Sequence, residues 1–180
     1  SNLTDDIEAI LLQVEDRYRE QCRSILTGGE FTFSQAWQDW LLYFNNFKGR
    51  GWGGGVYIDI GSNDATYISN TLFFDKCLGW RGICFEPQKR YHEAIRRDRS
   101  CELIPHCVLG KAAKVSSRNH GVSFSVNEDA NGNIACVGLD DILRERSIKK
   151  VDLVNLDIEG MEHAVLRCFP FEVMATGSVF

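Results

Sequence analysis

The sequence predicts an α/β fold built on a parallel β-sheet, and two patterns support this prediction. Short runs of strand-forming apolar residues end at glycine or proline, as residues 56–60 (VYIDI) do before Gly61. These runs alternate with helical patterns of about ten residues, which is typical of βαβ units with right-handed crossovers. The chain has 180 residues, 44% of them hydrophobic, so it is long enough for one core and short for two domains.

The first part of the chain, residues 1–48, is predicted to be a helical extension. Apolar residues recur at three- and four-residue steps over 3–26, which predicts one amphipathic helix that ends before a pair of glycines. A second helix is expected from Ser34, as its N-cap, to about Phe47. The glycine-rich segment 49–55 then joins this extension to the main fold.

The main α/β domain is predicted over residues 56–180. Between about 112 and 138, short alternating stretches around an Asn-Gly-Asn turn predict an antiparallel hairpin inserted into the α/β order. The expected strands are 56–60, 82–86, 103–109 and 151–157, and the expected helices are 66–78, 88–99 and about 161–168.

Charge and hydropathy restrict the partners. The net charge of −5 is opposite to the balance of a protein that grips nucleic-acid phosphates, so no nucleic-acid partner is expected. The basic run from Lys89 to Arg99 is interpreted as a solvated helix face. No apolar run approaches the ~20 residues of a membrane span, so no membrane partner is expected either.

The seven cysteines are odd in number, and no two have C-x-x-C spacing. Zinc sites and disulfide frameworks need clustered or paired thiols, so we expect reduced cysteines that act as small buried hydrophobes. That expectation favours a reducing compartment, and we predict a cytoplasmic protein.

Carboxylates follow several predicted strands at their carboxyl ends, where open α/β sheets bind ligands. Only Gly61 is present where a dinucleotide site needs Gly-x-Gly-x-x-Gly, which disfavours a dehydrogenase. An acidic rim suits a cationic ligand with hydroxyls and an amine, and S-adenosylmethionine has a sulfonium, a ribose diol and an ammonium. Glu86 lies 25 residues after Gly61, which is one strand–helix–strand unit. The rim carboxylates are Asp59, Asp64, Glu86 and Asp157.

Several segments resemble the FkbM-type methyltransferases, in the same order, over roughly residues 33–170. They are 57–64 (YIDIGSND), 69–71 (SNT), 79–87 (GWRGICFEP), 139–143 (LDDIL), 156–162 (LDIEGME) and, upstream, Ser34-Gln35 with Asp39. The resemblance implies a Rossmann-like class I fold that depends on S-adenosylmethionine. A complete class I methyltransferase continues for several more strands, so we expect the sheet to be truncated at its C-terminal strands. The unpaired edge that this leaves would favour a homodimer.

The resemblance also implies roles for individual residues. Asp59, Gly61 and Asn63 would shape the methionine end, and Glu86 would hold the ribose. Residues around His106-Cys107-Val108 would flank the adenine, and Asp157 would lie beside the reactive methyl. The full set of expected cofactor-binding residues is Asp59, Gly61, Ser62, Asn63, Asp64, Glu86, Pro87, Cys107, Val108 and Asp157.

The predicted reaction is methyl transfer to a hydroxyl of a small molecule or sugar. Asp157 is the expected general base, with Glu159 and Glu162 behind it, because a hydroxyl acceptor must lose its proton. No metal is expected. The alternative function is a binding module that keeps the fold without turnover.

Structural alternatives remain open for the same residues. Asp59 or Asp64 would then cap a helix, Glu86 would be an exposed strand-end charge, and Glu159 would form an ion pair.

Overall fold

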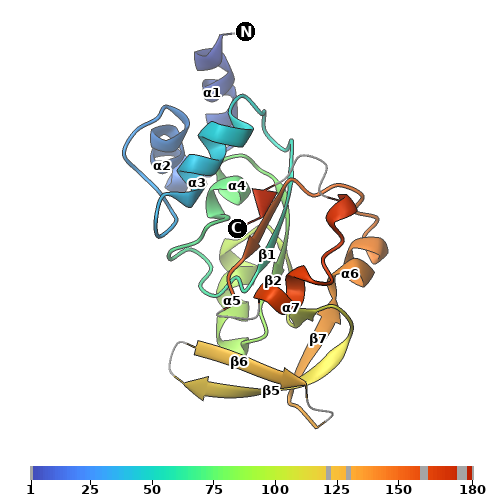
Figure 1. The fold of residues 1–180 in the computed structure, drawn as a ribbon. Helices are drawn as coiled ribbons and strands as arrows, with labels where there is room; N and C mark the ends of the chain where they lie inside the picture. Colours follow the sequence, from blue (N-terminus) through green and yellow to red (C-terminus); the bar gives the residue numbers. More distant parts are fainter. Residues whose placement is uncertain (1, 121–122, 129–130, 159–161, 174–177, 180) are drawn as a thin grey trace.

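The computed structural model describes residues 2–120, 123–128, 131–158, 162–173 and 178–179. Its centre is a parallel five-stranded sheet in the order β3-β2-β1-β8-β9, flanked by helices (Figure 1). In chain order this is the strand order of a doubly wound fold, which confirms the predicted α/β class. The strands are β1 (Val56–Ile60), β2 (Arg81–Phe85), β3 (Glu102–Ile104), β8 (Leu153–Leu156) and β9 (Ser178–Val179).

β1 is the central strand, and the strand order reverses beside it. It pairs in parallel with β2 on one side and with β8 on the other, so Asp59 lies opposite both Cys84 and Asn155. The carboxyl ends of these three strands therefore meet at one edge of the sheet, where open α/β sheets bind their ligands.

Alternate residues of the strands enter two different hydrophobic clusters, as the period of two requires. Tyr57, Cys84 and Leu153 pack in the cluster that contains the N-terminal helices. Ile58 and Val154 pack in the cluster on the other face. Asp59 and Asn155 alternate with Ile58 and Val154 along their strands, so two polar side chains lie on the side of the N-terminal helices.

The N-terminal segment forms two helices, α1 (Leu3–Leu11) and α2 (Asp16–Leu26), and the prediction of one helix over 3–26 is wrong. The Arg19 guanidinium donates hydrogen bonds to the carbonyls of Leu11 and Val14, at 3.2 and 3.1 Å, and stabilises the break. The second predicted helix is shorter than expected. It begins with α3 (Gln38–Leu42) and continues as a π-helical turn to Phe47.

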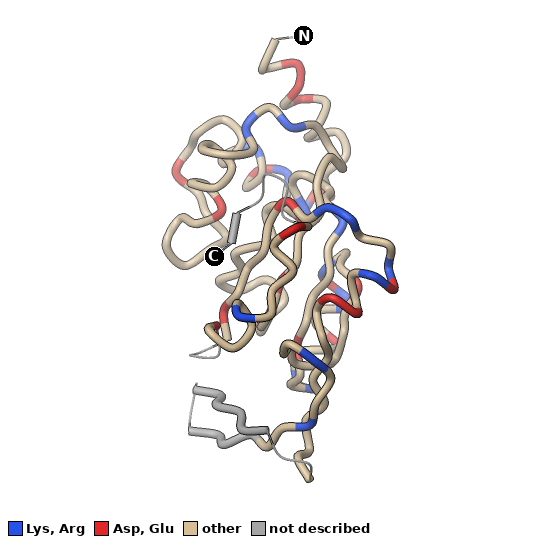
Figure 2. The backbone as a smooth tube through the Cα atoms, turned by 45° about the vertical axis from the view of Figure 1, so that its right-hand side comes forward, with Lys and Arg blue, Asp and Glu red and all other residues tan. Residues whose placement is uncertain are grey.

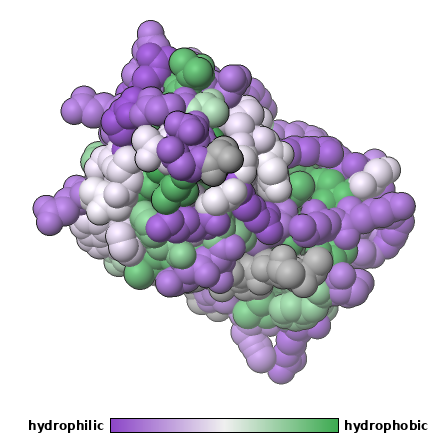
Figure 3. All heavy atoms as spheres, turned by 90° about the horizontal axis from the view of Figure 1, so that it is seen from above, coloured by the Kyte–Doolittle hydropathy of each residue, from purple (hydrophilic) through white to green (hydrophobic). Residues whose placement is uncertain are grey.

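These N-terminal helices pack against the α/β core, in the same hydrophobic cluster as Tyr57 and Phe74. Seen from their end of the molecule, hydrophobic and hydrophilic surface are interspersed (Figure 3). Among the side chains that the structure describes, Leu12 is the most exposed of the large apolar ones, at 80%. No helix in the described part of the chain has the length and apolar character needed to cross a membrane.

The helix predicted over 66–78 is only the five-residue α4 (Leu72–Lys76). The segment before it turns irregularly, with Ile68 at a φ of 54° and Tyr67 73% exposed. The next helix, α5 (Lys89–Asp98), agrees with the prediction over 88–99. Arg99, however, is fully buried and is not part of a solvated face.

A second sheet follows, in the order β4-β7-β5-β6, and it occupies the region where an inserted hairpin was predicted. The predicted turn at residues 131–133 does not join a hairpin, because β6 and β7 on its two sides both pair antiparallel with β5 and not with each other. The single strand predicted over 103–109 is wrong: β3 and β4 belong to different sheets and are separated by Pro105. Basic and acidic segments are interspersed over the described backbone, and neither sign forms one continuous stripe (Figure 2). The remaining elements are β4 (Cys107–Leu109), β5 (Ala113–His120), β6 (Ser123–Glu128), β7 (Ile134–Gly138), α6 (Leu139–Glu145), α7 (Glu162–Leu166) and a 3₁₀ turn (Phe171–Val173).

Six of the seven cysteines are paired, so the prediction of reduced cysteines is wrong for them. The pairs join residues that are 55, 17 and 29 positions apart, so their partners cannot be read from local spacing. Cys168 is free and exposed. The three disulfides are Cys22–Cys77, Cys84–Cys101 and Cys107–Cys136.

Candidate functional site

The ends of β1, β2 and β8 are in direct backbone contact. The N–H groups of Gly61 and Ser62 donate to the carbonyl of Phe85, at 3.0 and 3.2 Å, and the N–H of Asp157 donates to Ile60 at 3.1 Å. Three segments that the sequence singled out thus form one continuous edge.

Gly61 is required at this edge for two reasons. Its φ is +83°, which favours glycine, and a Cβ on Gly61 would lie 2.2 Å from the carbonyl oxygen of Asp157. The glycine therefore allows the loop after β1 to pass directly against the end of β8. Ser62 follows it and is buried, and its hydroxyl donates to the carbonyl of Asp59 at 3.1 Å.

Glu86 is buried just after β2. This burial excludes the alternative that Glu86 is an exposed charge at the end of the strand. Its two carboxylate oxygens accept backbone N–H bonds from Asn63 and Gln88, both at 2.8 Å. Burial raises the pKa of Glu86 above its usual value, and these two hydrogen bonds oppose that shift. His92 of α5 donates from Nε2 to the Glu86 carbonyl at 2.7 Å and fixes the backbone at the same point.

The other residues of the β1 loop divide into exposed and capping positions. Asn63 is exposed and has a φ of 54°. The Oδ1 atom of Asp64 accepts the N–H groups of Thr66 and Tyr67, at 3.0 and 2.8 Å. Asp64 therefore caps a turn in the segment before α4, and the alternative of a helix cap is wrong because no helix begins there.

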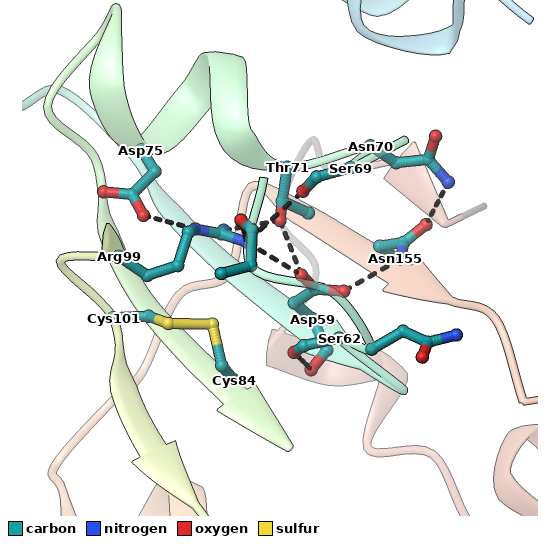
Figure 4. Close-up of polar contacts among 12 residues, drawn as sticks. Asp59, Ser62, Ser69, Asn70, Thr71, Asp75, Cys84, Arg99, Cys101 and Asn155 are labelled. Carbon is teal, nitrogen blue, oxygen red and sulfur yellow. Dashed lines mark hydrogen bonds and ion pairs between the residues drawn. A yellow bond between two sulfur atoms is a disulfide. The ribbon is translucent and has the colours of Figure 1, made fainter. Parts of the chain in front are cut away.

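Asp59 points away from the open edge, into a buried polar network (Figure 4). Its carboxylate accepts hydrogen bonds from the hydroxyl of Thr71 at 2.6 Å and from the amide of Asn155 at 2.8 Å. Asn155 in turn accepts the amide of Asn70 at 3.0 Å. Asp59 does not cap a helix directly, and its contact with a cofactor stays a prediction.

Asp157 is exposed immediately after β8, at the same edge as Gly61. Glu159 lies outside the described residues. Glu162 is half-buried in the first turn of α7, and His163 beside it is exposed. Of the expected bases that the structure describes, Asp157 is the exposed one, and its role as a base stays a prediction.

A pocket of about 560 Å³ lies between α5, the connection from β3 to β4, and the start of β7. Pro87 and His106 line it, next to Glu86 at the strand ends. Of the residues expected at the adenine, Cys107 is bonded to Cys136, and Val108 is 4% exposed in the core. His106 is therefore the member of this trio that faces the pocket.

The sequence interpretation missed Arg99, Asp75 and Asn155. Arg99 was assigned to a solvated face because the residues before it are charged, and Asn155 lies inside an apolar strand. A polar residue in such a strand, opposite Asp59 in a parallel pair, was the signal available for Asn155. Within the described parts of the chain, no group of three His, Cys, Asp or Glu side chains could hold a metal ion.

The parallel sheet and its strand order define a Rossmann-like α/β protein. The model of the methyltransferase FkbM domain matches residues 59–173, which is more than half of the chain. The chain therefore belongs to the FkbM methyltransferase family. No curated protein and no solved structure shows a significant match to it.

Proposed function

We propose that this protein transfers a methyl group from S-adenosylmethionine to a hydroxyl of a small molecule or sugar. The observation that carries the proposal is the meeting of the 61–63 loop, Glu86 and Asp157 at one edge of the sheet. The loop contacts both acids directly, through the Asn63–Glu86 hydrogen bond and the close approach of Gly61 to Asp157.

Glu86 is the proposed ribose ligand. An ionised carboxylate has about four lone-pair positions, and backbone N–H groups occupy two of them, so two are left for a diol. The residue is 2% exposed, so we expect the 61–63 loop to shift when the ligand binds. The pocket lined by Pro87 and His106 would receive the adenine beside it.

Asp157 is the proposed general base. In the reaction, the acceptor oxygen attacks the methyl carbon in line, the carbon–sulfur bond breaks, and S-adenosylhomocysteine leaves. The hydroxyl proton passes to the Asp157 carboxylate, which belongs to an exposed residue. The sulfonium is a good leaving group, so positioning by the edge residues supplies much of the rate.

Thermal unfolding with S-adenosylmethionine, S-adenosylhomocysteine or NAD tests the cofactor. A ligand at 100 times its Kd adds about 2.7 kcal/mol to the free energy of unfolding, so we expect a clear rise in Tm with the two sulfur compounds. A rise with NAD alone would contradict the proposal. Release of S-adenosylhomocysteine with hydroxylated acceptors then tests turnover, and binding with no turnover on any of them would favour the inactive binding module.

We also propose that the protein works in an oxidising compartment, in place of the cytoplasm that the sequence suggested. Three disulfides persist where thiols are not kept reduced, and the prediction of a reducing compartment rested on unpaired cysteines. Alkylation of thiols in the cells that make the protein, followed by peptide mass spectrometry, provides the test. We expect label on Cys168 and cross-linked peptides for the other six, and label on all seven would overturn the proposal.

A further inference from the structure

Arg99 lies at the centre of a buried network beside the proposed site, just after the last residue of α5 (Figure 4). Its side chain is 0% exposed. Its Nε donates to Asp75 at 2.6 Å, and its Nη1 lies 3.6 Å from the Asp59 carboxylate. The guanidinium thus joins α4 to the central strand.

The same guanidinium contacts the loop between β1 and α4 at three points. Its Nη1 approaches the Ala65 carbonyl at 3.4 Å and the Ser69 hydroxyl at 3.3 Å, and its Nη2 donates to the Thr71 hydroxyl at 2.7 Å. Nη2 also reaches the hydroxyl of Tyr57 at 3.1 Å. The planar fork of donors is filled by partners in fixed directions, which a lysine could not reproduce.

The charges require this arrangement. Asp59 and Asp75 are each 2% exposed, so each needs a partner at this depth. Burial alone would lower the pKa of Arg99, but Tyr57 and the two carboxylates outweigh it and raise the pKa. Arg99 therefore stays protonated. Its guanidinium holds both the second half of the loop and the carboxylates of Asp59 and Asp75.

We infer that Arg99 is a positioning residue for cofactor binding. Its contacts at Ala65, Ser69 and Thr71 fix the course of the loop whose first residues, 61–63, contact Glu86 and the end of β8. The inference rests on the proposed function, because the ligand that benefits is the proposed cofactor. Arg99 itself does not touch the open edge and acts through the loop.

Two variants test the inference, Arg99→Lys and Thr71→Val. The first keeps the charge and loses the fork, and the second removes one hydroxyl while nearly keeping the shape. We expect the Kd for S-adenosylhomocysteine to rise about tenfold in Arg99→Lys, as the loss of one charged hydrogen bond would give, and less in Thr71→Val. If Arg99→Lys fails to fold, Thr71→Val carries the test.

The control is Ile25→Val, a buried position in α2 that takes no part in the hydrogen-bonded network around Arg99. It should lower Tm and leave the Kd unchanged. If Arg99 had a purely structural role, its variants would behave as this control does, with a lower Tm and an unchanged Kd. Amide hydrogen exchange on ligand-free protein gives a second readout, and we expect faster exchange over 61–71 in the two network variants alone. Unchanged exchange there would overturn the inference, even if no variant or parent binds the cofactor. A parent that does not bind S-adenosylhomocysteine would instead contradict the proposed function.

Discussion

The backbone N–H of Asn63 donates a 2.8 Å hydrogen bond to the Glu86 carboxylate, and so ties the loop after β1 to the end of β2. The two residues are 23 positions apart in sequence, and parallel pairing of their strands brings them together. The proposed ribose ligand is thus held by the same loop that would contact the methionine end of the cofactor. A substitution at either residue should therefore affect the position of both.

Glu86→Gln should weaken cofactor binding by about tenfold to a hundredfold. The amide keeps the shape but has one acceptor oxygen, so it cannot serve two backbone N–H groups and a diol together. A lost charged hydrogen bond is worth about 1.5–3 kcal/mol. Calorimetric titration with S-adenosylhomocysteine measures the change, and an unchanged Kd would remove Glu86 from the site.

Cofactor affinity should fall in acid at a higher pH than an ordinary glutamate would give. Burial raises the pKa of Glu86 above 4.5, so the carboxylate that accepts the diol protonates earlier as the pH falls. A raised pKa also means that the fold favours the protonated form. The contribution of Glu86 to the free energy of unfolding is therefore largest below pH 4.5 and is lost as pH rises through its folded pKa.

A pH series of Kd values checks this dependence. Glu86→Gln is the matched control, since titration of the ligand itself affects both proteins. The difference between the two proteins should shrink as the pH falls, and a constant difference would contradict the assignment.

Asp157→Asn should keep cofactor binding and lose most of the turnover. The substitution preserves the size of an exposed side chain but removes the proposed proton acceptor, and general bases contribute about 10²–10⁴-fold to rate. Initial rates of S-adenosylhomocysteine release, measured beside a Kd, separate the two effects. Full turnover in this variant would exclude Asp157 as the base.

Gly61→Ala should lower the free energy of unfolding by at least about 2 kcal/mol and disrupt the edge. Alanine is strained at a φ of +83°, and its Cβ would strike the Asp157 carbonyl, which cannot move without shifting β8. Gly51→Ala is the matched control, because a Cβ at Gly51 meets nothing within 4 Å. Urea unfolding of both variants gives the comparison, and equal losses would show that the close approach is unimportant.

Removing the Cys22–Cys77 disulfide, as Cys22→Ala with Cys77→Ala, should cost up to about 4 kcal/mol. The bond closes a loop of 55 residues, and the chain-entropy argument scales with the logarithm of that length. Calorimetric unfolding measures the loss. Cys168→Ser should leave Tm unchanged, because Cys168 is exposed and unpaired.

The central strands could be predicted from the sequence because their signals are local. The runs 56–60 and 82–86 are apolar and end at glycine or proline, and both lie within one residue of the observed strands. The convergence of Gly61, Glu86 and Asp157 followed from the geometry of parallel sheets. Backbone contacts confirm that the three segments adjoin, while their roles toward a ligand stay predictions.

Other features depend on tertiary contacts and gave no local signal. The break between α1 and α2 contains no glycine or proline, and Arg19 stabilises it from the following helix. The segment 65–71 has apolar residues at helical spacing, but Arg99 holds its backbone and hydroxyls in an irregular course. The separation of β3 from β4 is different, because it did have a local signal: Pro105 interrupts the run that was predicted as one strand.

The Cys22–Cys77 bond spans the exposed glycines at 51–54, so the two sides of that segment are joined twice, once by the peptide chain and once through sulfur. A protease that cuts within those glycines would leave two polypeptides still held as one molecule. Such nicked material would migrate as an intact species on a non-reducing gel and separate into two bands only after reduction. Its helices would stay on the α/β core, and a cut within this exposed segment would not release them.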